Sequence, residues 1–103
     1  MGCVEVTFRT RKLEREYRKS AAAIKAYGAQ VARKYIERIN IIKGARNIDD
    51  LSRLPGLRCH PLKGDRQSQF AVNLTGFYRL IFTLHGDALE IANIEEVSKH
   101  YDD

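Results

Sequence analysis

The chain has 103 residues, of which 44% are hydrophobic, a length and composition that suit one small domain with a single core. The formal net charge of +5 is unevenly placed: residues 1–66 contain 16 Lys and Arg against 7 Asp and Glu, whereas residues 67–103 contain 2 against 6. No apolar run is long enough to span a membrane, and the N-terminus lacks the order of a secretory signal peptide. We therefore expect a cytoplasmic, single-domain protein (residues 1–103) with a cationic face that attracts an anionic partner.

The chain contains two cysteines and three histidines, without the regular spacing of a metal site. Cys3 and Cys59 do not have the CxxC spacing of zinc or redox motifs, and two thiols alone do not make a disulfide framework. We therefore expect free thiols, and neither a metal nor a cofactor.

The first 28 residues predict a strand followed by a bent helix. Residues 4–8 (VEVTF) alternate apolar and polar side chains, which is typical of a half-buried strand. Thr10 is placed to cap a helix that ends at Gly28, with a bend near Ser20, which could act as a second cap. Four apolar residues are expected to share one face of this bent helix: Leu13, Tyr17, Ile24 and Tyr27.

Residues 29–45 (AQVARKYIERINIIKGA) carry the strongest periodic pattern in the chain. Apolar residues recur at intervals of three and four, which predicts an amphipathic helix with Lys and Arg on its outer side. Lys43-Gly44 should end this helix, and Asn47 is placed to cap about one further helical turn before Pro55-Gly56. The expected buried face consists of Val31 or Ala32, Tyr35, Ile39 and Ile42.

Beyond this point the pattern changes from helical to strand-like. Residues 69–74 (QFAVNL), 78–84 (YRLIFTL) and 88–97 (ALEIANIEEV) predict strands, joined by turns at Gly76 and at residues 85–87. The whole order predicts an α+β domain: an N-terminal strand, two helices and then an antiparallel sheet of three to four strands, with the helices packed on one face.

The segment RCHPLKGDR (residues 58–66) is either a solvated basic loop or the working edge of a site that handles phosphate. Alternation along the strand at residues 78–84 turns Arg79 away from the apolar set, toward the face opposite the helices. His60, Lys63 and Arg66 lie in or beside the neighbouring strand. These cations and the histidine could therefore converge with Arg79 on that face.

A histidine among several fixed cations, without an evident nucleophilic side chain, suits cleavage of RNA. The substrate supplies its own 2′-OH as nucleophile, so the protein needs a base, cations for the charge that builds on phosphorus, and an acid for the leaving 5′-oxygen. Histidine can take either proton role near neutral pH, and the planar guanidinium of arginine matches phosphate oxygens. A basic RNA-binding domain without catalysis is the simpler alternative.

The two remaining histidines carry less weight. His85 lies in a predicted hairpin turn, where a surface position is the ordinary outcome. His100 and Tyr101 lie in the polar tail SKHYDD, which is either a frayed terminus or a flap over the same face as Arg79.

The sequence from Leu54 to the C-terminus resembles a known family. LPGLRCHPLKGDRQSQFAVNLTGFYRLIF, followed by GDALEIANIEEVSKHY, is similar to toxins of type II toxin–antitoxin systems in the RelE superfamily, in particular the HigB-like branch, also described as plasmid maintenance system killer proteins. Residues 60–66 (HPLKGDR) with Tyr78-Arg79 downstream form the most specific part. The N-terminal strand and two helices have the right order and length, so the resemblance extends over nearly the whole chain.

The resemblance implies a toxin that enters the ribosomal A site and cuts mRNA there by metal-free attack of the 2′-OH, which inhibits translation. It also implies a cognate antitoxin, encoded beside it and expected to contain a helix-turn-helix. His60 would transfer or orient a proton, and Arg79 would bind the scissile phosphate. The predicted catalytic residues are His60, Lys63, Arg79 and Tyr101. The predicted substrate contacts are Arg58, Arg66, Asn73 and His100.

Two departures from the family pattern bear on activity. Thr75 stands in the turn before Arg79, where such toxins commonly carry another arginine. The tail EEVSKHYDD is longer than the family's usual ending EDYH. Either Glu96-Val97 aligns with the acidic-aromatic pair of that ending and the tyrosine is lost, or Tyr101 takes its place from a displaced position, which is the alternative we expect. A ParE-like toxin that acts by binding gyrase is the alternative within this fold, although that branch generally lacks the His-Pro-Leu-Lys cluster.

Overall fold

The computed structural model describes residues 4–54, 56–62, 69–86 and 91–99. This part of the chain forms helices and strands in an α+β arrangement, which confirms the predicted fold class. None of its helices is long and apolar enough to cross a membrane. The helices are α1 (Arg11–Arg18), α2 (Ser20–Tyr27), α3 (Ala29–Gly44) and α4 (Ile48–Ser52). The strands are β1 (Glu5–Phe8), β2 (His60–Pro61), β3 (Gln69–Asn73), β4 (Tyr78–His85) and β5 (Ile91–Lys99).

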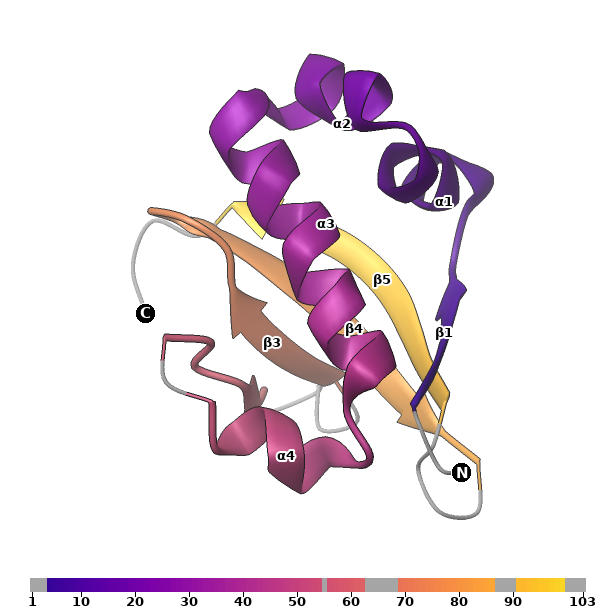
Figure 1. Cartoon of the computed structure of the whole chain (residues 1–103), viewed down its shortest axis with the longest axis vertical. Coiled ribbons are helices and arrows are strands. Elements are labelled where there is room, and N and C mark those ends of the chain that lie inside the picture. The colour runs from indigo at the N-terminus through magenta and orange to yellow at the C-terminus, as the bar shows by residue number, and fades with distance from the viewer. Residues whose placement is uncertain (1–3, 55, 63–68, 87–90, 100–103) are drawn as a thin grey trace.

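The strands form one sheet in the order β1-β5-β4-β3-β2 (Figure 1). β2, β3, β4 and β5 pair antiparallel, whereas β1 pairs parallel with β5 at the far edge. The three strands predicted after the helices, β3, β4 and β5, therefore form the centre of the sheet. The two-residue β2 supplies the fourth strand of the antiparallel part.

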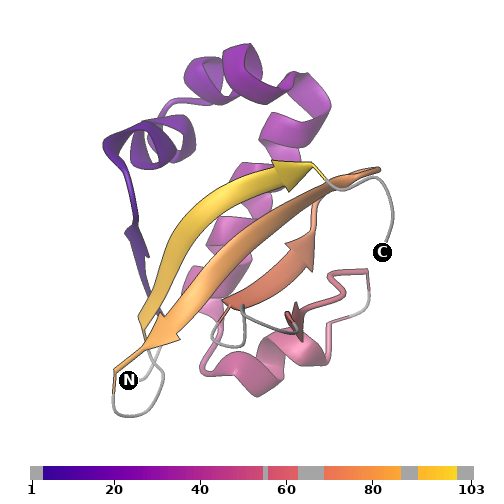
Figure 2. The same ribbon diagram turned by 180° about the vertical axis from the view of Figure 1, so that it is seen from behind.

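α3 crosses one face of the sheet, and α1 and α2 pack beside it near the upper end of the sheet (Figure 1); Figure 2 shows the other face, with α3 behind the strands. α1 begins where predicted because the Oγ1 atom of Thr10 accepts the backbone N–H of Leu13 at 3.2 Å. α4 begins in the same way, since Oδ1 of Asn47 accepts the N–H of Asp50 at 3.1 Å. Gly28 separates α2 from α3 with a φ of 89°, in the left-handed region that favours glycine.

The bend between the first two helices lies where the sequence placed it, but its predicted cap is wrong. α1 ends at Arg18 and α2 begins at Ser20 itself, so Lys19 occupies the N-cap position and makes no side-chain capping bond. The prediction for Ile24 is also wrong, because this side chain is 46% exposed. The break resets the helical phase, and Ala23 faces the core instead.

The main core lies between α3 and the inner face of the sheet. The predicted face of α3 is buried, and it packs against alternate residues of β3, β4 and β5. Tyr35 is fully buried, and its hydroxyl donates a hydrogen bond of 2.7 Å to the Leu13 carbonyl, which satisfies its polar end. The largest fully buried side chains of this core are Tyr35, Ile39, Ile42, Leu51, Val72, Leu80, Phe82 and Ile94.

The outer face of the sheet is partly buried as well. Ala71 and Ile81 are partners across β3 and β4, lie outside the main core, and are 0% and 2% exposed. Ile81 and Thr83 share the outer face predicted for Arg79, and the sequence did not predict that both are buried. The centre of the outer face is therefore covered by neighbouring side chains and is not open to solvent.

A bulge changes the alternation of β5. Ile81 is opposite Glu96, but the next residue of β4 is opposite Ile94, so Glu95 is an extra residue on β5. Beyond this point Glu96 shares the outer face with Ile81, and Val97 packs on the core. A strand without the bulge would place these two residues on the opposite faces.

Candidate functional site

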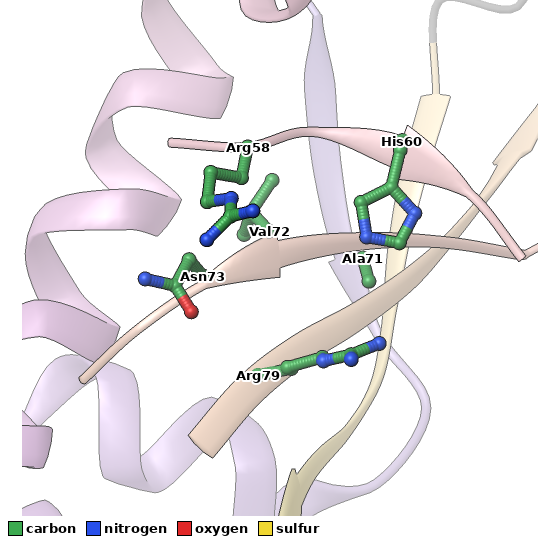
Figure 3. A pocket seen from close by; sticks show the side chains of 6 residues that line it. All are labelled: Arg58, His60, Ala71, Val72, Asn73 and Arg79. Carbon is green, nitrogen blue, oxygen red and sulfur yellow. The ribbon is translucent and has the colours of Figure 1, made fainter. Parts of the chain in front are cut away.

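A hollow of about 90 Å³ lies on the outer face of the sheet (Figure 3). Its walls come from β2 and the segment before it, from β3 and from β4. Two guanidinium groups and an imidazole meet here, and none of the described residues in the lining carries a carboxylate, so this part of the hollow suits an anion. The residues that line it are Arg58, His60, Ala71, Val72, Asn73 and Arg79.

His60 and Arg79 reach this hollow from strands that are not neighbours. His60 is the Cα partner of Ala71 on β3, and Ala71 is the partner of Ile81 on β4, so one strand separates the two. The sequence-based expectation of adjacent strands is therefore corrected. Ala71 has only a methyl group, which leaves room for the imidazole of His60 to lie over β3 on the side where the Arg79 guanidinium extends (Figure 3).

Asn73 and Arg79 are Cα partners at the ends of β3 and β4 that border the turn. The N–H of Asn73 donates to the Leu57 carbonyl at 2.7 Å, so its backbone groups point away from β4. Asn73 and Arg79 therefore form a non-hydrogen-bonded pair, in which Cα atoms approach to about 4.5 Å and side chains lie close together. The amide of Asn73 and the guanidinium of Arg79 thus border one anion-sized space.

Arg58 holds a backbone conformation that its residue type rarely adopts. Its φ is 53°, and it is the one non-glycine residue with a positive φ in the described part of the chain. Such conformations cost of order 1–3 kcal/mol and cluster at functional sites. The conformation turns the guanidinium of Arg58 toward the Asn73 side of the hollow (Figure 3).

The ring of His60 has one hydrogen-bond contact within the described residues. Its Nδ1 atom lies 3.2 Å from the Pro61 carbonyl oxygen, which can only accept a hydrogen bond. In the tautomer that makes this hydrogen bond Nδ1 donates, and Nε2 has the lone pair. The side chain is exposed, so Nε2 can accept a proton from a bound molecule.

The chain matches the sequence profile of a family described as RelE-like toxin of type II toxin–antitoxin system HigB, over residues 6–97. This match spans most of the chain. The protein belongs to the HigB-like family of RelE-like toxins. No curated protein sequence matches this toxin.

Solved structures share the fold of this HigB-like toxin at low sequence identity. The YoeB/ParE toxin from Agrobacterium tumefaciens is 19% identical, with a TM-score of 0.56 over 95% of this chain and 100% of that one. A chain of the YoeB–YefM complex from Staphylococcus aureus is 15% identical, with a TM-score of 0.62 over 95% of this chain and 98% of that one. YafQ from E. coli is 13% identical, with a TM-score of 0.61 over 93% and 92%.

Four of the eight predicted site residues of the toxin line the hollow, and four do not belong to the described part of the chain. Arg58, His60, Asn73 and Arg79 come together from three separate segments. The other four, Lys63, Arg66, His100 and Tyr101, lie outside the described residues. Thr75 lies in the turn after β3, where its carbonyl accepts the N–H of Tyr78 at 2.8 Å.

Glu96 is a residue of this face that was not among the predicted site residues. The register places it in the row His60, Ala71, Ile81, Glu96 across four strands. Strict alternation from Ile91 would turn it toward the core, so only the bulge at Glu95 brings it to the outer face. No sequence signal marks that bulge.

A second polar cluster occupies the other end of the same face. Thr83 donates to Oε2 of Glu95 at 2.9 Å, and Asn93 donates to the same oxygen at 2.7 Å. Oγ1 of Thr83 has one proton and gives it to Glu95, so Nε2 of His85 must be the donor in its 2.8 Å bond to Thr83. His85 is exposed as predicted, but it ends β4 and belongs to this cluster.

The toxin's thiols and carboxylates do not form a metal site in the described residues, where no group of three His, Cys, Asp or Glu could hold an ion. Cys59 lies between Arg58 and His60 but is half-buried and packs against the core. Burial raises the pKa of its thiol to about 11. A thiol in this state is a poor nucleophile at neutral pH.

Proposed function

We propose that this HigB-like toxin is a ribosome-dependent mRNA endonuclease that cuts mRNA in the A site and thereby inhibits translation. The observation that carries this proposal is the convergence of Arg58, His60, Asn73 and Arg79 on one hollow of the outer sheet face. This set contains a proton acceptor and two fixed cations, which are two of the three requirements for cleavage by the substrate's own 2′-OH.

In the proposed reaction Nε2 of His60 accepts the proton of the 2′-OH. The 2′-oxygen then forms a bond to phosphorus, the bond from phosphorus to the 5′-oxygen breaks, and the products are a 2′,3′-cyclic phosphate and a 5′-hydroxyl end. Arg79 and Arg58 bind the phosphate oxygens while negative charge builds on them. Asn73 supplies a neutral amide beside Arg79, which suits a sugar or phosphate oxygen.

Four residues outside the described part of the chain complete the proposed site on sequence grounds. Lys63 and Tyr101 are proposed as catalytic groups, one of which returns a proton to the leaving 5′-oxygen. Arg66 and His100 are proposed as contacts to the mRNA.

We also propose that an antitoxin protein, encoded beside this toxin, binds and inhibits it. The solved structures with this fold include a heterotetrameric complex of YoeB–YefM toxin–antitoxin from Staphylococcus aureus. The excess of Lys and Arg in residues 1–66 favours an antitoxin segment with acidic residues.

The proposal is tested by adding the purified toxin to a reconstituted translation system and mapping mRNA ends by primer extension. We expect new 5′ ends inside translated codons, no such ends without ribosomes, and a rate reduced about 100-fold or more in His60→Ala. Intact mRNA with wild-type toxin, or equal cleavage by His60→Ala, contradicts the proposal. Growth arrest with inhibited gyrase and uncut mRNA would instead support a toxin that acts by protein binding.

A further inference from the structure

The edge of β3 changes partner next to the hollow. His60 pairs with Ala71, so a ladder continued by two residues would pair Arg58 with Asn73. The N–H of Asn73 instead donates to the carbonyl of Leu57, one residue earlier. Arg58, which has the positive φ, lies between Leu57 and His60. At this residue the segment that leads into β2 shifts by one residue relative to β3.

The carbonyl of Asn73 is bonded by a side chain from the helix layer. Nε of Arg38, on α3, donates to this carbonyl at 2.9 Å. The side chain of Arg38 is only 11% exposed, and its Nη1 atom contacts the Glu37 carboxylate at 2.7 Å. A guanidinium therefore takes the place that a strand neighbour's N–H would occupy in a continued ladder, and it does so with a charged donor.

These bonds fix Asn73 from two sides. The carbonyl of Leu57 accepts the N–H of Asn73, and Arg38 donates to the Asn73 carbonyl. The side chain of Asn73 lines the hollow together with Arg79. The burial of Arg38 argues against direct contact with a large substrate. Its effect on the hollow must pass through the backbone of Asn73.

We propose that Arg38 is a positioning residue for the proposed nuclease site, acting through Asn73 to set the distance between Arg58 and Arg79. The inference rests on the proposed function for its kinetic consequence, although the bond itself can be tested without cleavage. Small displacements of groups that orient a substrate cost roughly 100-fold in rate.

The test compares Arg38→Ala with Arg33→Ala, in kinetics and in amide hydrogen exchange followed by NMR. Arg33 lies on the same helix, is exposed, and makes no hydrogen bond or ion pair to a described residue, so both variants lose one positive charge. We expect Arg38→Ala to lower kcat roughly 10-fold or more, with a smaller change in KM, at a temperature where it is fully folded. The N–H of Asn73 should exchange roughly 10-fold faster in Arg38→Ala and at the wild-type rate in Arg33→Ala.

Two further variants separate positioning from general stabilisation. Glu37→Gln removes the ion pair but keeps the bond to Asn73, and it should retain wild-type kcat. Arg38→Lys keeps one charged donor and should restore part of kcat. Combined with Arg79→Ala, the substitution Arg38→Ala should add little further loss, because its effect passes through the same phosphate contact.

The proposal for Arg38 is overturned if Arg38→Ala matches Arg33→Ala in kcat, if its loss simply adds to that of Arg79→Ala, or if exchange at Asn73 does not change. If the wild-type toxin does not cleave mRNA, the proposed function fails. Faster exchange at Asn73 would in that case still support the positioning bond, and unchanged exchange would still overturn it.

Discussion

The hydroxyl of Tyr27 donates a hydrogen bond of 2.5 Å to the carboxylate of Glu16, a residue that is only 3% exposed. The other carboxylate oxygen of Glu16 contacts Nζ of Lys12, also at 2.5 Å. Burial, then this hydrogen bond and the charge of Glu16, raise the pKa of Tyr27 above its ordinary value. The pair ties α1 to α2 across the bend that separates them.

We therefore predict that Glu16→Gln destabilises the toxin by about 2 kcal/mol. Each carboxylate oxygen of Glu16 accepts one hydrogen bond, from Tyr27 or from Lys12, whereas a glutamine side chain has only one acceptor oxygen. Glu14→Gln is the matched control, since Glu14 is on the same helix and pairs with Arg18 in an exposed i,i+4 bridge. It should change stability by less than about 0.5 kcal/mol. Urea denaturation followed by circular dichroism measures the free energy of unfolding of both variants. An equal loss of stability in Glu16→Gln and Glu14→Gln would contradict the prediction that the burial of Glu16 makes its carboxylate more important.

Arg79 is predicted to contribute through its position as well as its charge. Arg79→Ala should lower the rate of mRNA cleavage by about 100- to 1,000-fold, and Arg79→Lys should recover only part of it, because an ammonium lacks the planar fork that matches phosphate oxygens. Arg9→Ala removes the same charge from a 63% exposed side chain near the second polar cluster. A comparable loss in Arg9→Ala would mean that net charge, rather than the placement of Arg79, drives the reaction.

The helices and the central strands could be predicted because their signals are local. Thr10 and Asn47 act as caps three residues before the N–H groups they bind, and the apolar period of α3 continues along the whole helix. β2 has no such signal. Its two residues become a strand only because Ala71, ten residues beyond Pro61, is available at the sheet edge.

The candidate site was predictable in composition but not in layout. The sequence named Arg58, His60, Asn73 and Arg79, whereas the intervening β3 and the positive φ of Arg58 depend on long-range pairing. Arg38 was missed because it lies among the Lys and Arg of an amphipathic helix, whose outer side the pattern predicts to be solvated. Only the structure shows that this arginine reaches a strand carbonyl.

Thr83 is predicted to stabilise the bulged part of β5. It is 7% exposed and donates to Glu95, whose side chain is 16% exposed, so its removal leaves a largely buried carboxylate with one partner fewer. Thr83→Val keeps the shape of the side chain and should lower stability by about 1 to 2 kcal/mol. Thr83→Ser keeps the hydroxyl and should lose less. Urea denaturation of both variants distinguishes the hydroxyl from packing, and a Thr83→Val protein as stable as wild type would contradict the prediction.

The thiol of Cys59 should react slowly although it lies between two residues of the hollow. Burial raises its pKa to about 11, so the folded protein keeps the thiol protonated at a pH where an ordinary cysteine is partly thiolate. At pH 8 alkylation by iodoacetamide should be about 100-fold slower than in the unfolded chain, and the rate should rise steadily as the pH approaches 11.

The measurement needs a Cys3→Ser background, so that Cys59 is the one thiol in the chain. The same protein in concentrated urea gives the rate of the exposed thiol and serves as the control. The sign of the shift also affects stability: the folded state holds a proton that the unfolded chain releases, so this contribution is fully present below about pH 9 and is lost as the pH rises through about 11. Rapid alkylation of the folded protein at pH 8, with a rate that no longer rises at higher pH, would mean that the thiol next to His60 is already ionised and available to the hollow.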